Sequence, residues 1–280
     1  METVALQILL GLALSAGMGA LGYWRQSLSP SGVVGAVIVG SLIFGLGGWI
    51  WGLLLITFFI SSSFLSHYRQ RDKEAVAEKF AKGGRRDLGQ ALANGGMGAV
   101  LAVIYALSRD PVLLAAYLGV MATVNADTWA TELGVLSRVP PRLVTTGQEV
   151  SPGTSGGVSS LGTWASLAGA LLIGAVATAL TQAASLLGGG GWDARALAYP
   201  VLAVAGGMAG SLFDSLLGAT VQGIYYCDRC GKETESARHR CGQVTLPVRG
   251  WLWLNNDLVN FIASMVGGLV AASLGWLFWR

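Results

Sequence analysis

The chain has 280 residues, of which 53% are hydrophobic and only 12% are charged, and its mean hydropathy is +0.58. A soluble domain carries about twice that charged fraction, so the composition excludes an ordinary soluble enzyme and indicates an integral membrane protein. The net charge is only +3, and we expect no nucleic-acid partner.

Apolar runs of span length recur along the chain and predict an all-α, polytopic transmembrane helix bundle, with residues 1–280 as a single membrane-embedded domain. A transmembrane barrel would show alternating segments of roughly ten residues instead. No basic segment precedes the first apolar run, which therefore indicates a span and not a cleaved signal peptide. The second span is short, and a bundle of seven spans is the alternative. The eight predicted spans are residues 3–22, 32–47, 49–65, 91–108, 111–134, 160–186, 197–222 and 257–279.

Positive charges divide unequally between the two sides that eight spans define. Alternate loops on one side hold 15 of the 18 Lys and Arg residues, and the other side keeps Arg109, Arg195 and Arg280. Positive residues favour the cytoplasm, so we expect the first side to be cytoplasmic and both termini to be non-cytoplasmic.

Three long loops lie on the predicted cytoplasmic side. Residues 66–90 are basic and amphipathic, as expected of a helix on the anionic headgroups of membrane lipids. The alternative is a phosphate-binding role for Arg85 and Arg86 in this loop. Residues 135–159 form the second loop, and residues 223–256 form the third, which contains every cysteine.

Two carboxylates, Asp127 and Asp214, lie inside predicted spans that run toward the cytoplasm. A charge at bilayer depth costs several kcal/mol unless it is paired, solvated or bound to a cation, which makes both acids candidate functional residues. Counted with the rise per residue of an α-helix, each acid lies roughly 13–15 Å below the cytoplasmic surface. We expect them to share one site for Mg²⁺, which binds carboxylates, water and phosphate oxygens. The alternative is two separate acids, each hydrogen-bonded within the bundle.

Polar residues cluster near both acids and at the starts of nearby helices. Glu132 is closer to the surface, where solvation or a pair with Arg138 explains it. The loop 151–159, S-P-G-T-S-G-G-V-S, precedes a helix and offers exposed amide groups for an anion, although such a loop is more often a simple turn. The candidate lining residues by position are Asn125, Thr128, Ser215, Thr154, Ser155, Gly156, Gly157, Asn256 and Asn260. Asn256 and Asn260 are four apart and face one side of a helix, with N-capping as the alternative.

The third loop contains C-x-x-C at Cys227 and Cys230, followed by His239 and Cys241. Such ligands suit a tetrahedral, structural Zn²⁺. Free thiols are one alternative. The other is a phosphate site made by His239 with Arg238 and Arg240.

Together, these motifs resemble the polytopic membrane family that contains the chloroplast phytyl-phosphate kinase of tocopherol synthesis, and are distantly similar to CTP-dependent dolichol kinases and CDP-lipid synthases. The resemblance covers nearly the whole chain. It rests on L-S-P-S-G (28–32), G-R-R-D-L-G-Q-A-L-A-N-G-G (84–96), N-A-D-T-W-A-T-E-L-G (125–134), R-L-V-T-T-G-Q-E-V-S-P-G-T-S-G-G-V-S (142–159), G-S-L-F-D-S-L-L-G-A-T-V-Q (210–222) and N-N-D-L-V-N (255–260).

The resemblance implies phosphoryl transfer from a nucleoside triphosphate, expected to be CTP, to an isoprenyl monophosphate such as phytyl phosphate, with Mg²⁺ as cofactor. It implies that Asp127 and Asp214 are the acids of the metal–phosphate site. Gln148 stands where the family pattern leads us to expect a lysine, and Arg142 or Arg85 is the expected replacement. The resemblance implies further lining residues at Asn94, Asn125, Thr154, Gly156, Gly157, Asn256 and Asn260, with His239 at a basic position.

Two other functions fit the residues. An NDP-lipid synthase would transfer a nucleotidyl group and release pyrophosphate. An ion-coupled transporter also uses intramembrane acids and Gly-rich helices, but it is expected to show inverted repeats and access from both sides. Here both acid-bearing spans run in the same direction, which favours an enzyme.

Overall fold

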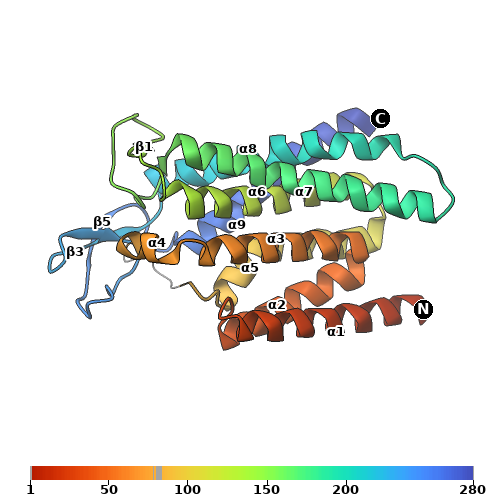
Figure 1. Cartoon of the computed structure of the whole chain (residues 1–280), viewed down its shortest axis with the longest axis horizontal. Helices are drawn as coiled ribbons and strands as arrows, with labels where there is room; N and C mark the ends of the chain where they lie inside the picture. The colour runs from red at the N-terminus through yellow and green to blue at the C-terminus, as the bar shows by residue number, and fades with distance from the viewer. Residues whose placement is uncertain (1, 78, 80–83, 280) are drawn as a thin grey trace.

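A computed structural model describes residues 2–77, 79 and 84–279 of the chain (Figure 1). Within these residues, eight helices are long and apolar enough to cross a membrane. The expected polytopic helix bundle is therefore confirmed. Both termini lie at one end of the bundle, and the short strands and α4 lie at the other end (Figure 1).

A π-helical turn lengthens the short second apolar run into a candidate span. Helix α1 covers Glu2–Trp24, and α2 covers Pro30–Leu42, with Ser29 as its N-cap. A π-helical turn over Ile43–Gly47 extends α2, so the second candidate span is Pro30–Gly47. Gly48, with φ of +93°, then allows the reversal into α3, Trp49–His67. The seven-span alternative is therefore not needed.

The basic segment 66–90, which we expect to lie on the lipid headgroups, contains one short helix after α3. This helix is α4, Gln70–Ala77, and residues 78 and 80–83 lie outside the described residues. The chain around Arg86 is extended: its N–H donates to the Ser27 carbonyl at 2.9 Å, and its carbonyl accepts from the Ser29 N–H at 2.9 Å. Helix α5, Leu88–Ser108, then begins with a capping box made by Asp87 and Gln90.

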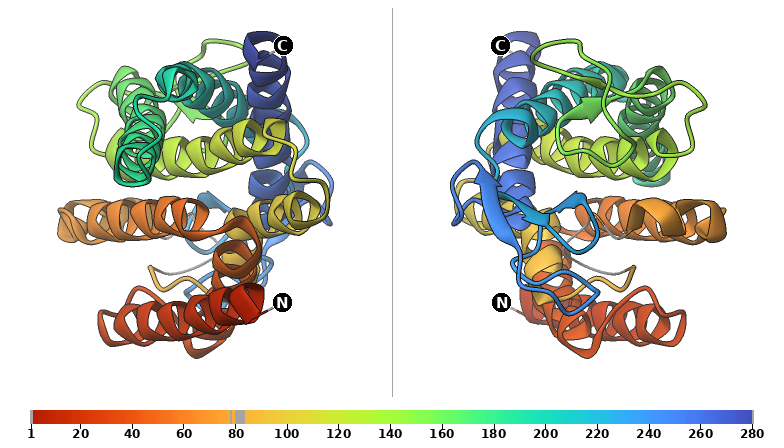
Figure 2. Two further views of the ribbon diagram at one scale, coloured as in Figure 1. Left: turned by 90° about the vertical axis from the view of Figure 1, so that its right-hand side faces the viewer. Right: turned by 90° about the vertical axis from the view of Figure 1, so that its left-hand side faces the viewer.

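Helix α6, Val112–Gly134, forms the centre of the C-terminal half. Its residues 115–126 are all buried, because α7 (Ser160–Leu187), α8 (Tyr199–Thr220) and α9 (Asn256–Trp279) pack around it. A short 3-10 helix, η2 (Ala194–Ala198), leads into α8. Figure 2 shows α1 and α2 at the edge of the bundle that lies farthest from α7 and α8.

Three glycines allow α6, α8 and α9 to approach very closely. A Cβ added to Gly206 of α8 would lie 2.8 Å from the Cα of Gly119 in α6 and 2.6 Å from the carbonyl oxygen of Gly267 in α9. A Cβ on Gly119 would collide with the same Gly267 carbonyl. Small residues at helix crossings permit this backbone contact, as is common in membrane proteins.

Small sheets form in two of the long loops. Strands β1 (Arg142–Leu143) and β2 (Gly157–Val158) make an antiparallel pair in the second loop. In the third loop, β3 (Ile224–Cys227), β4 (Lys232–Thr234) and β5 (Leu246–Arg249) form an antiparallel sheet in the order β4-β3-β5. The second and third long loops therefore contain regular secondary structure.

Candidate functional site

A polar cavity of about 260 Å³ opens beside the strands and extends between the helices. Its walls come from α5, α6, α8, the starts of α7 and α9, and the loop before β2. Twelve of the sequence-predicted site residues line it: Arg86, Asn94, Asp127, Thr128, Thr154, Ser155, Gly156, Gly157, Asp214, Ser215, Asn256 and Asn260.

Helix register explains why Asp127 and Asp214 meet at the same cavity. Each acid lies eight residues after a glycine of the α6–α8 contact, since 127 − 119 and 214 − 206 are both eight. The two helices run in the same direction, so both carboxylates lie roughly 12 Å beyond the crossing. Measured to the helix ends at Gly134 and Thr220, they are about 9–10 Å deep, somewhat shallower than expected.

Several buried polar atoms of the cavity have no hydrogen-bond partner in the described part of the chain. They are Asp214 Oδ2, Asn260 Oδ1 and Ser166 Oγ, and all three side chains line the cavity. Asn260 reaches this level because α9 runs antiparallel, seven residues before Gly267. Leaving such atoms unsatisfied costs about 1–3 kcal/mol each, so they are suited to hold a ligand or a cation. Carboxylate and amide oxygens are ligands that Mg²⁺ accepts.

The loop 151–157 lies against the end of α8. Gly156 has φ of +81°, and a Cβ at this position would collide with the backbone of Ala219. Lys79, which the sequence did not single out, donates to Ser151 Oγ at 2.5 Å and to Thr154 Oγ1 at 3.5 Å. Burial lowers the pKa of this lysine, and Glu233 opposes the shift. The cationic side chain of Lys79 therefore lies beside this loop, although position 148 holds Gln where the resemblance leads us to expect a lysine.

Glu235 is a cavity residue that sequence reasoning missed. It follows β4, and its Oε1 accepts from Gln222 Nε2 at 3.0 Å and from Ser155 Oγ at 3.2 Å. Its position depends on a non-local fold of the cysteine-containing loop, so no local pattern marks it. Gln222, Ser159 and Ser166 also line the cavity and were not singled out.

Arg86 lies between this cavity and a second, apolar pocket. Its Nη1 donates to Ser63 Oγ at 2.9 Å, and its guanidinium lies over the rings of Phe58 and Phe59. Burial lowers the pKa of Arg86, and Glu132 opposes the shift. The apolar pocket is enclosed by α1, α2, α3 and α5, and the two pockets share Arg86, Gln90 and Asn94.

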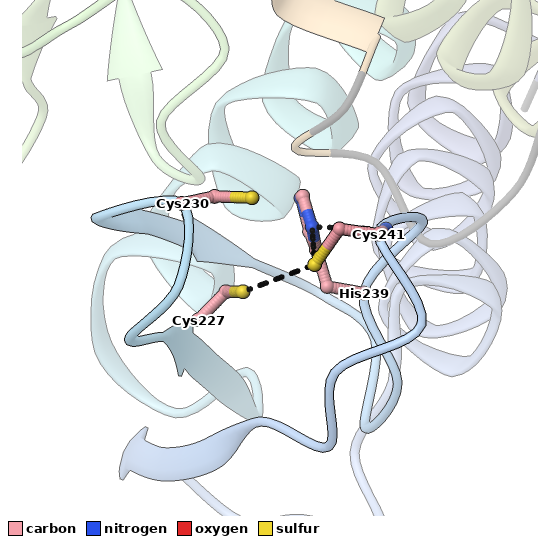
Figure 3. A group of neighbouring side chains, drawn as sticks. All are labelled: Cys227, Cys230, His239 and Cys241. Atoms are coloured by element: carbon pink, nitrogen blue, oxygen red, sulfur yellow. Dashed lines mark hydrogen bonds between the residues drawn. The ribbon is translucent and has the colours of Figure 1, made fainter.

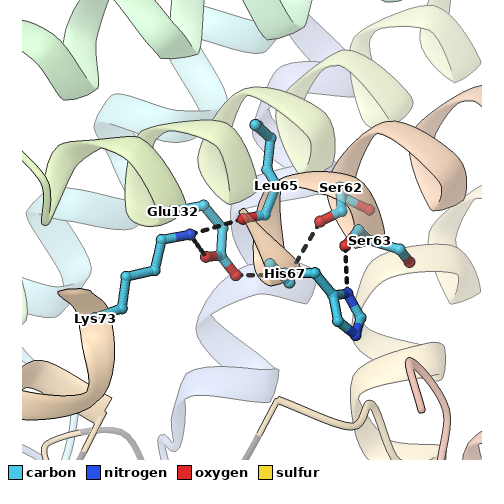
Figure 4. Close-up of polar contacts among 7 residues, drawn as sticks. Ser62, Ser63, Leu65, His67, Lys73 and Glu132 are labelled. Atoms are coloured by element: carbon cyan, nitrogen blue, oxygen red, sulfur yellow. Dashed lines mark hydrogen bonds and ion pairs between the residues drawn. The ribbon is translucent and has the colours of Figure 1, made fainter. Parts of the chain in front are cut away.

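Glu132 joins three elements at the rim of the cavity (Figure 4). Its Oε2 lies 2.6 Å from Lys73 Nζ of α4, and its Oε1 accepts from Ser66 Oγ of α3 at 2.6 Å. Lys73 also donates to the Leu65 carbonyl at 2.7 Å. The expected pair of Glu132 with Arg138 is therefore replaced by one with Lys73, and α4 is attached to the membrane helices.

Five predicted phosphate-site residues do not line the cavity: Arg85, Asn125, Arg142, Arg238 and His239. Arg85 donates to the Leu28 carbonyl at 3.0 Å and stacks over Tyr23. Asn125 is buried, where it accepts from Ser61 and donates to the Gly169 carbonyl. Arg142 is exposed and pairs with Glu149, and Arg238 is exposed on the third loop. Asn125 therefore connects helices, and Arg142 and Arg85 make their contacts away from the residues that line the cavity.

The cysteine motif folds into one cluster (Figure 3). None of its four residues lines the cavity. Ligand atoms of Cys227, Cys230, His239 and Cys241 all lie within 4.8 Å of one another. A backbone hydrogen bond at Gln243, followed by one with His239, lowers the pKa of Cys241 to about 6. A hydrogen bond with Cys241 raises the pKa of Cys230 to about 11. His239 faces the thiols and does not line the cavity.

Comparison with known proteins places these features in a family. The family model described as integral membrane protein DUF92 matches residues 13–268. The chain belongs to the DUF92 family of integral membrane proteins. It is therefore a multi-pass membrane protein, as the composition and the eight spans indicated.

The proteins similar to this DUF92 protein include relatives from a plant and an archaeon. It is 33% identical over 258 residues to Protein PGR of Arabidopsis thaliana, covering 87% of this chain and 88% of that protein. It is 30% identical to an uncharacterized membrane protein of Methanocaldococcus jannaschii, covering 88% and 84%. It is 27% identical to Protein VTE6, chloroplastic, of Arabidopsis thaliana, covering 87% and 64%. These matches confirm the family indicated by the motifs, and no solved structure matches.

Proposed function

We propose that this DUF92 protein is a membrane-embedded, Mg²⁺-dependent kinase for isoprenyl monophosphates. It transfers the terminal phosphoryl group of a nucleoside triphosphate, with CTP as the expected donor, to a lipid such as phytyl phosphate. The type of reaction is inferred from the family resemblance. The observation that carries it is the meeting of a polar cavity and an apolar pocket at Arg86, Gln90 and Asn94.

The two pockets match the two halves of such a lipid. Of the residues that line the apolar pocket, Leu14, Leu55 and Phe59 are typical, and three of its four polar members, Arg86, Gln90 and Asn94, form the shared wall. Under this proposal the isoprenyl chain lies among the apolar residues, and its phosphate lies at the shared wall. Arg86 is suited to this position because guanidinium groups bind phosphate oxygens in a bidentate manner.

The reaction needs charge neutralisation and alignment more than a covalent catalyst. An oxygen of the lipid phosphate forms a bond to the γ-phosphorus, the bond from that phosphorus to the β,γ-bridging oxygen breaks, and the products are the lipid diphosphate and the nucleoside diphosphate. The attacking oxygen is already anionic, so no general base is required. Asp127, Asp214 and Asn260 are the residues that would hold Mg²⁺, which supplies charge neutralisation at the phosphate oxygens. Lys79 and the loop 151–157 are the candidates to bind the nucleotide phosphates.

We further propose that the cavity opens to the cytoplasm and that both termini face the opposite side. The support is the position of 15 of the 18 Lys and Arg residues in loops on the cavity side. The partners under this proposal are nucleoside triphosphate, an isoprenyl phosphate and the surrounding membrane lipids, without nucleic acid.

The test uses purified protein in proteoliposomes with phytyl phosphate or geranylgeranyl phosphate, Mg²⁺ and each nucleoside triphosphate in turn. The expected result is lipid diphosphate and nucleoside diphosphate in equal amounts, with no turnover when EDTA is present. Pyrophosphate release with an NDP-linked lipid would assign the chain to nucleotidyl transfer. Uptake of a solute into the vesicles without any turnover would assign it to transport.

A further inference from the structure

The third cytoplasmic-side loop contains a cluster that the kinase proposal does not use. Cys227, Cys230, His239 and Cys241 bring four metal-ligating side chains together, with Cys227 Sγ 3.7 Å from Cys241 Sγ and His239 Nδ1 3.3 Å from the same sulfur (Figure 3). We propose that these four residues bind one Zn²⁺ in a closed, tetrahedral site, and that this site fixes the loop that places Glu235 in the cavity.

The backbone forms a tight turn at each ligand pair. At the first pair, the N–H groups of Cys230 and Gly231 donate to the Cys227 carbonyl at 3.2 and 2.8 Å, and Gly231 has φ of +63°. At the second pair, the Gly242 N–H donates to the His239 carbonyl at 2.9 Å, and Gly242 has φ of +85°. Each turn points two ligands in one direction, as the C-x-x-C half of a structural zinc site requires.

Burial distinguishes this cluster from a chance group of surface side chains. Cys227 is fully buried and His239 is 4% exposed, although the loop lies outside the spans. His239 Nε2 is buried and has no hydrogen-bond partner in the described residues. A cation bound at Nε2 would provide the polar partner that this buried nitrogen lacks.

Charge and thiol number favour zinc over a disulfide. All three cysteines are free, and a disulfide between any two would leave the third thiol and the histidine without a role. Zinc with three thiolates and a neutral imidazole carries a net negative charge. Arg229, whose Nη1 donates to the Cys241 carbonyl at 3.5 Å, lies beside the cluster and opposes that charge.

The two ligand pairs enclose the segment that carries Glu235. Residues 231–238 connect Cys230 to His239, and within them Glu235 bonds to Gln222 and Ser155 at the cavity wall. The Glu235 N–H also donates to the Lys79 carbonyl at 3.0 Å. Zinc binding therefore fixes both ends of this segment, and its effect on Glu235 is to position that side chain. The metal site stands whether or not the kinase proposal holds.

The test measures the zinc content of protein purified in detergent without chelators or added metal, using inductively coupled plasma mass spectrometry. We expect one zinc ion per chain in the wild type. We expect a loss of at least tenfold in Cys227→Ser and in His239→Ala. The chain has two histidines, so His67→Ala is the matched control: His67 is exposed, bonds to the Ser63 carbonyl, and its variant should keep full zinc content.

Two measurements on the wild type keep the proposal testable if the variants fail to fold. Replacement of zinc by Co²⁺ should give the intense visible bands of a tetrahedral, thiolate-rich site. Chelation should then increase hydrogen exchange of residues 231–238 several-fold while exchange in α6 stays unchanged. Absence of zinc from the wild type, an octahedral Co²⁺ spectrum, or a disulfide found by mass spectrometry would overturn the metal site. Unchanged exchange after chelation would overturn its role in placing Glu235.

Discussion

Gly206 of α8 lies so close to Gly119 of α6 that an added Cβ would be 2.8 Å from the Gly119 Cα. This contact sets the register of the two helices, since Asp127 and Asp214 both follow it by eight residues. The position of the candidate metal–phosphate site thus depends on a glycine contact at a distance from it.

Gly119→Ala should therefore destabilise the bundle. The new methyl group would collide with the Gly267 carbonyl, which is backbone and cannot rotate away. Overpacking of this kind costs about 1–3 kcal/mol, and we expect a lower Tm in detergent, measured by tryptophan fluorescence. Gly17→Ala is the matched control, because nothing lies within 4 Å of its added Cβ. An unchanged Tm for Gly119→Ala would contradict the proposed close contact.

Asp127→Asn and Asp214→Asn should each reduce the rate of phosphoryl transfer by about a hundredfold or more, as expected when a charge-stabilising group is lost from an active site. The fold should persist, because asparagine has nearly the same volume as aspartate. The measurement is formation of lipid diphosphate in proteoliposomes. Asp110→Asn, in the loop at the opposite end of the bundle, is the control and should retain wild-type activity. Full activity in both cavity variants would exclude the proposed metal site.

Arg86 and Arg85 are adjacent in sequence and should respond differently to the same substitution. Arg86→Lys keeps the charge but loses the bidentate geometry, and we expect kcat/KM for the lipid phosphate to fall roughly tenfold to a hundredfold. Arg85→Lys should change kcat/KM little, because Arg85 faces the Leu28 carbonyl and Tyr23. Equal losses of kcat/KM in the two variants would contradict a phosphate-binding role that is specific to Arg86.

The apolar pocket should limit the length of the lipid chain. Ala36 lines this pocket from α2, so Ala36→Phe should reduce kcat/KM for a long isoprenyl phosphate by roughly tenfold while short chains are accepted as before. Val34→Phe is the control on the same helix, since Val34 is 54% exposed on the outer face. The comparison is made with farnesyl and phytyl phosphates. A uniform loss across chain lengths would place the lipid tail elsewhere.

Composition and apolar runs determined the membrane class, the eight spans and the two intramembrane acids, because these features depend on local hydrophobicity and span length. The combination of motifs also indicated the family. The cysteine–histidine spacing correctly predicted that four ligand groups would gather, since both pairs lie in short turns of one loop.

Only the tertiary structure decided which polar residues share the cavity. Glu235 reaches it through a three-stranded sheet, and Lys79 lies beside the loop 151–157, whereas Arg85, Asn125 and Arg142 are used in contacts elsewhere. The physical reason is that side-chain direction at these positions depends on contacts between distant segments. A linear pattern gives the residue type and the approximate depth, but helix crossings and loop packing determine which groups face the same space.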